Sequence, residues 1–148
     1  MKLASYKATR PGLQGIYSRA VRVVDRGPYS HCELIFSDGL SASASYIDKG
    51  VRFKKIDYSQ HPEHWDIIDL PGFDEARARS WFEVNEGAPY DLLGNVRFVL
   101  PLVPESDIGW FCSEALLAAL GFREAWRHGP NGAAAVLAWW CGGVVVAA

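Results

Sequence analysis

Branched and aromatic residues gather in short stretches of the first half of the chain, in the pattern of β-strands. The predicted strands are Leu3–Lys7, His31–Phe36, Leu40–Tyr46, Val51–Ile56 and Trp65–Leu70. The Asp38-Gly39 pair is a strong hairpin signal between two of them. We expect these strands to form an antiparallel meander.

Apolar residues from Leu13 to Val24 instead recur at helical spacing and predict an amphipathic helix that ends before Gly27-Pro28. The second half of the chain is helical in pattern. Four further helices are predicted, namely one capped by Asp74 and running to about Glu86, a short one over Leu92–Leu100, one from Cys112 to Leu120, and one capped by Asn131 and running to Trp140. This order predicts an α+β fold in which an antiparallel sheet packs against helices.

The composition narrows the class of protein. A chain of 148 residues with 49% hydrophobic residues predicts a single domain over residues 1–148. The net charge of −2 comes without a basic stripe, which argues against nucleic acid as a partner. Three cysteines without a CxxC pair argue against a disulfide framework and a structural zinc site. We expect no metal and no cofactor, since no phosphate-binding or dinucleotide-binding motif occurs.

Targeting signals are not evident in the sequence. The first residues lack the apolar run of a secretory peptide, and Cys141-Gly142-Gly143 interrupts the apolar stretch from Ala133 to Ala148. The expectation is a protein without an integral membrane span that resides in the cytoplasm. The apolar end is either a helix plus strand in the core or a contact surface.

Cys112 is the first candidate for chemistry because it stands at the start of a predicted helix. The positive end of the helix dipole lowers the pKa of a thiol. No Ser, Thr, Asp or Asn directly precedes Cys112, so the helix-start N–H groups could bind an oxyanion. The alternative is an inert packing cysteine, since free cysteines are commonly buried.

A thiol nucleophile needs a base, and His31 is the best-placed imidazole. Alternation along its strand puts His31 and Glu33 on one face, and Cys32 with Leu34 on the other, so Cys32 is expected to be a core thiol. His61, His64 and His128 lie in polar loops, and no further ligand cluster supports a metal there.

The residue that orients His31 has two candidates. Ser43 comes alongside His31 if the strands pair around the Asp38-Gly39 turn, and Glu33 shares the face of His31. The serines of the 41–45 stretch could equally be small residues packed under another element. Tyr90 could donate its hydroxyl to an oxyanion, and Asp91 beside it could instead cap the following helix.

Three motifs in this order resemble a known family. Tyr29-Ser30-His31-Cys32-Glu33-Leu34, Gly87-Ala88-Pro89-Tyr90-Asp91 and Phe111-Cys112-Ser113-Glu114 are similar to the circularly permuted branch of the NlpC-type, papain-like cysteine hydrolases. That branch includes the YiiX-like and lecithin:retinol acyltransferase-like groups, in which the histidine strand precedes the cysteine helix. The resemblance covers roughly residues 29–122.

The resemblance implies a permuted papain-like fold with Cys112 as nucleophile and His31 as general base. It places the third polar residue on the strand after the histidine, at about Ser43, where many relatives have His or Glu. It also places Tyr90 and Asp91 near the nucleophile.

The leading hypothesis is therefore a cysteine peptidase or amidase that cleaves an amide bond, with peptidoglycan peptides as the first choice of substrate. The alternatives are a non-catalytic papain-like module of a phage particle, and a lipid acyl hydrolase or acyltransferase. The Ser-His-x-Glu-Leu and Ser-Asp-Gly segments also resemble segments of small proteins encoded by tailed phages. A phage particle is thus the second expected location, with tail or virion components as assembly partners.

Overall fold

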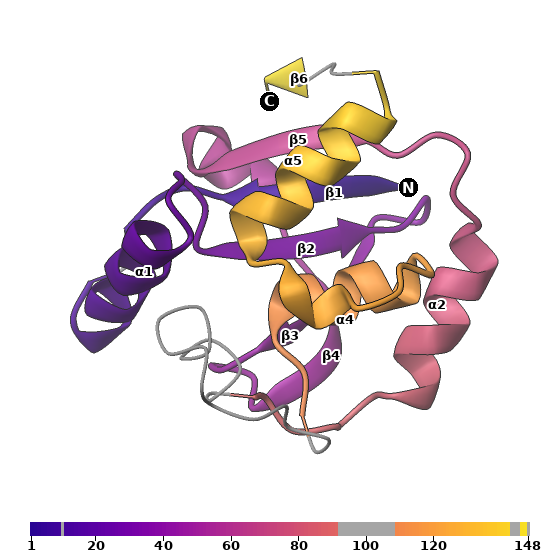
Figure 1. Cartoon of the computed structure of the whole chain (residues 1–148), viewed down its shortest axis with the longest axis horizontal. Helices are drawn as coiled ribbons and strands as arrows, with labels where there is room; N and C mark the ends of the chain where they lie inside the picture. Colours follow the sequence, from indigo (N-terminus) through magenta and orange to yellow (C-terminus); the bar gives the residue numbers. More distant parts are fainter. Residues whose placement is uncertain (10, 92–108, 143–145, 148) are drawn as a thin grey trace.

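The fold is built on one antiparallel sheet of six strands, in the order β4-β3-β2-β1-β5-β6 (Figure 1). The computed structural model describes the chain except residues 10, 92–108, 143–145 and 148. The strands are β1 (Lys2–Tyr6), β2 (His31–Ile35), β3 (Leu40–Ser45), β4 (Gly50–Lys55), β5 (Trp65–Asp69) and the short β6 (Val146–Ala147).

Helices join and cover these strands. The α-helices in the described ranges are α1 (Leu13–Val24), α2 (Glu75–Val84), α4 (Cys112–Ala119) and α5 (Pro130–Trp140). Short 3₁₀ turns lie at Tyr58–Gln60, Pro62–His64 and Ala125–Arg127. Within the described part of the chain, every helix is too short or too polar to cross a bilayer. The α+β prediction is confirmed.

The strand pattern predicts the elements well and their order only in part. The first five strands and α1 lie where the alternation and the helical period predict them. The predicted meander is correct for β2, β3 and β4 but wrong for the strand at residues 65–70. β5 pairs with β1, with Leu3 opposite Ile68, so β1 lies in the middle of the sheet between β2 and β5.

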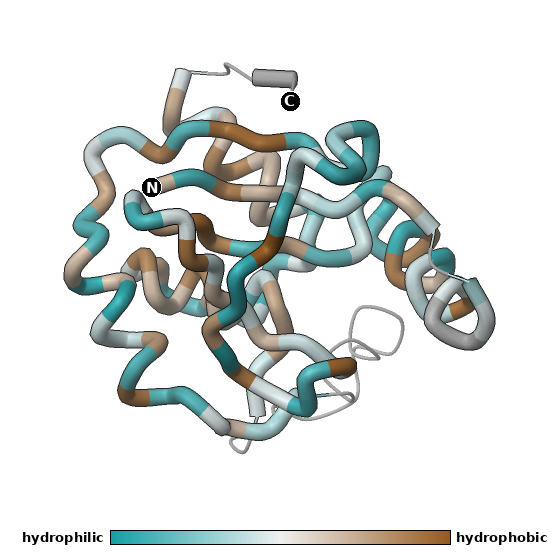
Figure 2. The backbone as a smooth tube through the Cα atoms, turned by 180° about the vertical axis from the view of Figure 1, so that it is seen from behind, coloured by the Kyte–Doolittle hydropathy of each residue, from teal (hydrophilic) through white to brown (hydrophobic). Residues whose placement is uncertain are grey.

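The two faces of the sheet bury different clusters. On one face, α2, α4 and α5 pack on residues such as Leu3 and Leu34 of the sheet to form the main core (Figure 1). On the opposite face, Ala4, Tyr6 and Trp65 form a smaller cluster. Figure 2 shows the corresponding hydrophobic segments along the central strands. The main core thus fixes α4 on the sheet through its buried leucines.

Two helix predictions need correction. The predicted apolar side of α1 is not wholly buried, because Ile16 is 65% exposed. Asn131 does not cap α5, which begins at Pro130 with Gly129 as its N-cap residue. Asn131 instead ties two segments together: its Oδ1 accepts the Tyr29 N–H at 2.8 Å, and its Nδ2 donates to Asp25 at 2.9 Å.

Other sequence predictions meet the structure in different ways. The Asp74 cap is confirmed, because its carboxylate accepts the Arg77 N–H at 3.0 Å at the start of α2. The expected helix at 92–100 and part of the apolar end, 143–145, lie outside the described residues. The rest of that end forms α5 and then β6, which pairs with the outer edge of β5.

Candidate active site

Cys112 is the first residue of α4, as the sequence predicts. The N-cap residue is Phe111, whose aromatic side chain has no oxygen with which to cap the helix. Glu114 supplies the acidic residue of the first turn. Cys112 itself is 2% exposed, and Leu116 and Leu117 behind it are in the main core. The thiol is therefore held at a buried helix start that has no side-chain cap.

Next to this helix start, the ladder between β2 and β3 opens. The Phe36 N–H donates to the Leu40 carbonyl at 2.9 Å, and the register continues through Leu34 opposite Ala42. Hydrogen-bonded pairs recur at every second residue of an antiparallel ladder. The pairs Phe36–Leu40 and Leu34–Ala42 would therefore be followed by Cys32–Ala44. The paired register ends before them. The Ser43 hydroxyl instead donates to the Cys32 carbonyl at 2.7 Å.

The sulfur of Cys112 lies at this opening. Both the backbone and the side chain of Cys32 hydrogen-bond to Cys112, and α4 packs on β2 and β3 together. The sheet thus accommodates the start of α4 at the point where two neighbouring strands separate. This arrangement is not evident from the alternation of the strands, because an isolated strand pattern does not show where a ladder opens.

His31 lies at the start of β2 and contacts both candidate partners. Its Nε2 lies 2.7 Å from Oε1 of Glu33, and the ring also hydrogen-bonds to Cys112. Since Glu33 occupies Nε2, the other ring nitrogen, Nδ1, is left for the sulfur. The His31 side chain is 16% exposed. Three residues of one site, Cys112, His31 and Glu33, are therefore connected in series.

The charges of this series favour a thiolate and an imidazolium. Burial alone would lower the pKa of His31, but the negative charge of Cys112, the hydrogen bond to it and the neighbouring Glu33 raise that pKa to about 9. The hydrogen bond from Cys32 and the positive charge of His31 hold the pKa of Cys112 well below its ordinary value, against the effect of burial. Both shifts favour the ionic form of the pair over the neutral form.

Glu33 is a buried carboxylate with complete partners. It is 1% exposed, and Arg52 of β4 donates two hydrogen bonds to it, of 2.7 Å to Oε2 and 2.5 Å to Oε1. Burial would raise the pKa of Glu33, but Arg52 and His31 together lower it to about 2. Arg52 in turn donates through Nε to Asp48 at 2.9 Å. Glu33 therefore stays ionised beside His31.

The two candidates for orienting His31 have different positions. Glu33, the alternative in the sequence, is the residue hydrogen-bonded to the imidazole. Ser43 is buried, but its hydroxyl donates to the carbonyls of Cys32 at 2.7 Å and Ala44 at 3.2 Å. Ser43, the first choice from the sequence, thus hydrogen-bonds to backbone carbonyls where the β2–β3 ladder opens.

Tyr90 and Asp91 lie beside the approach to α4. Tyr90 forms a bridge with Trp110, and the Asp91 N–H donates to the Trp110 carbonyl at 3.1 Å. Gly109 allows this contact, because a Cβ there would lie 2.8 Å from the Pro89 carbonyl oxygen. This brings the Tyr90-Asp91 motif close to Cys112. The helix that Asp91 is expected to cap lies outside the described residues.

Tyr17 of α1 is a neighbour of the site that sequence reasoning missed. Its hydroxyl lies 3.0 Å from that of Tyr90. Burial chiefly raises the pKa of Tyr17, and the charge of Cys112 adds to the effect, so the phenol stays protonated near the thiolate. Tyr46 packs against both rings, with centroid distances of 6.5 Å to Tyr17 and 6.1 Å to Tyr90. A helical period gives no signal for such a contact.

The remaining histidines are not part of this series. The possible ligand atoms of His61, Glu63 and His64 lie within 4.8 Å of one another on an exposed turn, which is the grouping that could hold a metal ion among the described residues. The main-chain carbonyl of His128 accepts the Ser113 hydroxyl at 2.8 Å, which fixes the loop after α4.

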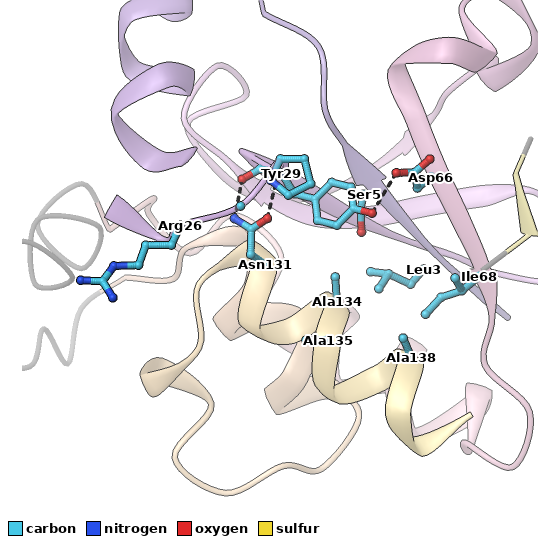
Figure 3. Close-up of a pocket in the computed structure, with 12 residues that line it drawn as sticks. Leu3, Ser5, Arg26, Tyr29, Asp66, Ile68, Asn131, Ala134, Ala135 and Ala138 are labelled. Carbon is cyan, nitrogen blue, oxygen red and sulfur yellow. Dashed lines mark hydrogen bonds between the residues drawn. The ribbon is translucent and has the colours of Figure 1, made fainter. Parts of the chain in front are cut away.

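A separate cavity of about 340 Å³ lies between α5 and the β1–β5 part of the sheet (Figure 3). Leu3, Ile68, Ala134 and Ala138 point into it. At its polar end, the Tyr29 hydroxyl donates to Asp66 at 2.8 Å. The lining does not include Cys112, His31 or Glu33, so this cavity is distinct from the candidate active site.

Comparison with known proteins leaves the family open: the chain matches no family model and no curated protein.

Proposed function

We propose that this chain is a cysteine hydrolase that cleaves an amide bond through an acyl-enzyme on Cys112. The observation that carries the proposal is the connected series of Cys112, His31 and Glu33, with the sulfur at an uncapped helix start. A thiolate next to an imidazolium is both a strong nucleophile and a source of the proton that the leaving group needs.

The reaction follows from the positions of these groups. The Cys112 thiolate attacks the carbonyl carbon, and the first N–H groups of α4 stabilise the oxyanion that forms. When the C–N bond breaks, the His31 imidazolium protonates the departing amine. The neutral imidazole then takes a proton from water, which attacks the thioester and releases the carboxylic acid. The Cys112 thiolate and the His31 imidazolium are thereby restored.

Glu33 and Arg52 support His31 in this scheme. The carboxylate of Glu33 accepts from Nε2 and so keeps Nδ1 directed at the sulfur through each proton transfer. Arg52 keeps Glu33 ionised in a buried position. This is a task that a serine hydroxyl at residue 43 would perform less well, because a hydroxyl carries no charge.

The order of the motifs supports a permuted papain-like fold of the NlpC type, with the histidine strand β2 before the cysteine helix α4. On this proposal the substrate is a cell-wall peptide, and the protein acts in the cytoplasm or within a phage particle. The proposal of a peptide substrate comes from the resemblance of the motifs. The Cys-His-Glu series supports acyl chemistry in general.

The experiment is to incubate purified peptidoglycan with the protein and to identify the released peptides by mass spectrometry. Cleavage of one kind of amide bond is expected, together with its loss in Cys112→Ala. Cys141→Ala is the matched control, because Cys141 is also free but lies at the end of α5, and it should retain activity.

The same variants separate the rival functions. Release of fatty acid from phospholipid vesicles, or acyl transfer to an added amine, without cleavage of peptidoglycan would assign the site to lipid acyl chemistry. Full activity in Cys112→Ala would refute the nucleophile. If folded protein lacks all three activities and its Cys112 reacts as an ordinary thiol, the binding-module hypothesis replaces the enzyme.

A further inference from the structure

We propose that Cys32 is a positioning residue for the nucleophile, which donates hydrogen bonds from both its backbone N–H and its thiol to the sulfur of Cys112. This inference rests on the proposed function and gives a role to a thiol that alternation alone assigns to the core. It concerns how the site keeps Cys112 ionised in a buried position.

The open ladder is what makes Cys32 available. Its backbone faces β3, where its regular partner would be Ala44, but the paired register ends at Leu34 and Ala42. The Ser43 hydroxyl satisfies the Cys32 carbonyl at 2.7 Å. The N–H of Cys32 is then directed at the incoming α4, and it hydrogen-bonds to Cys112. The Cys32 N–H therefore bonds to Cys112 and not to the neighbouring strand β3.

The side chain of Cys32 points the same way. Cys32 is fully buried on the sheet face covered by α4, in the same cluster as Cys112 and Ala115. Its thiol hydrogen-bonds to Cys112, an interaction that raises the pKa of Cys32 well above its ordinary value, with burial acting in the same direction. Cys32 therefore keeps its proton and acts as the donor, while Cys112 is the thiolate acceptor.

A second donor is needed because the surroundings of Cys112 are mixed in charge. Among the described residues that interact with its charge, His31 of β2 favours the thiolate. The negative charge of the Asp25 carboxylate, at the end of α1, disfavours it, and Tyr17 of α1 is a neutral phenol at neutral pH. On its own element, Glu114 adds another acidic group in the first turn of α4. The thiol of Cys32 offsets the repulsion from Asp25 at close range.

The test compares Cys32→Ala, which removes the thiol donor and keeps the backbone N–H, with Cys32→Ser, which replaces the thiol by a hydroxyl. Both variants shorten or shrink the side chain, so packing alone should affect them alike. Each is made in a Cys141→Ala background. The rate of alkylation of Cys112 by iodoacetamide is measured from pH 4 to pH 10, with the labelled residue located by mass spectrometry and folding checked by circular dichroism.

In Cys32→Ala the apparent pKa of Cys112 should rise by about one to two units, so alkylation below that pKa slows by about tenfold per unit. Cys32→Ser should retain most of the low pKa. The inference is overturned if the two variants titrate alike, or if Cys32→Ala titrates like the parent protein. Should Cys32→Ala not fold, Cys32→Val provides the variant without a side-chain donor, and the same two outcomes decide.

These outcomes can be told apart from failure of the proposed function. An ordinary thiol pKa for Cys112 in the parent protein would contradict the ionic Cys112–His31 pair itself. A low pKa in the parent that does not respond to Cys32 contradicts only the role given to Cys32.

Discussion

His31 Nε2 lies 2.7 Å from Oε1 of Glu33, two residues further along the same strand. Residues at this spacing share one face of a strand, so the backbone of β2 alone brings imidazole and carboxylate together. Together with the charge of Cys112 and the hydrogen bond to it, this bond raises the pKa of His31 although the ring is largely buried. On the proposed function, Glu33 therefore contributes to the alkaline limit of activity.

Replacing Glu33 by Gln removes the negative charge and keeps the shape. The pKa of His31, held at about 9 in part by Glu33, should fall, and the alkaline limb of the pH–rate profile should move to lower pH. We expect kcat/KM at neutral pH to fall by about 10- to 100-fold, the value of one hydrogen bond to a charged group. Glu63→Gln, at an exposed glutamate, should leave the profile unchanged. An unmoved alkaline limb in Glu33→Gln would remove Glu33 from the site.

Ser43→Ala should act on stability and not on the base. The buried carbonyl of Cys32 loses the hydroxyl that donates to it at 2.7 Å, at a cost of about 1–3 kcal/mol in the free energy of unfolding. Urea unfolding measures this loss. Ser41→Ala is the matched control on the same strand, because the Ser41 hydroxyl bonds to the Tyr58 hydroxyl and not to the Cys32 carbonyl. If Ser43→Ala shifts the alkaline limb as Glu33→Gln is expected to do, the orienting role returns to Ser43.

Arg52→Met should make the protein sensitive to acid. The pKa of Glu33 is about 2 in the folded protein and 4.5 ordinarily, so its contribution to stability is complete above about pH 4.5 and is lost as pH falls toward 2. Without Arg52, burial raises the pKa of Glu33 and the loss begins at higher pH. At pH 7 we expect a loss of about 3–5 kcal/mol, because a buried charge loses its partner.

Denaturant unfolding of Arg52→Met between pH 3 and pH 7 measures both effects. Lys54→Met provides the control, because Lys54 pairs with the same Asp48 as Arg52 does but is about half exposed. It should change stability by less than about 1 kcal/mol. Equal stability of Arg52→Met and the parent protein across this pH range would contradict the buried pair.

The sequence predicts most elements of this fold because each follows a local pattern. Hydrophobic alternation predicts β2, β3 and β4, and the Asp38-Gly39 turn predicts the hairpin between the first two. The position of β1 in the middle of the sheet could not be predicted this way. It depends on the crossover of β5 to pair with β1, and a strand pattern carries no information about its partner.

In the site, too, residues that follow a local pattern can be predicted from the sequence, and tertiary contacts cannot. Cys112 and His31 are recognisable from the helix start and the strand start. The role of Arg52 was missed, although extending the register from Glu33 across Ser43 leads to Arg52, which pairs with Ser43 in β4. The contact of Cys32 with Cys112 had no such signal, because the opening of the β2–β3 ladder is a tertiary feature.

The most direct test of the central claim is a competition between two thiols of the same molecule. At pH 6, a limiting amount of iodoacetamide is added and the labelled cysteine is identified by mass spectrometry. Cys141 is the more accessible thiol, but burial raises its pKa, whereas Cys112 is 2% exposed and its pKa is held well below the ordinary value. The account predicts faster labelling of Cys112, and loss of this advantage in His31→Ala. Preferential labelling of Cys141 in the folded parent protein would contradict it.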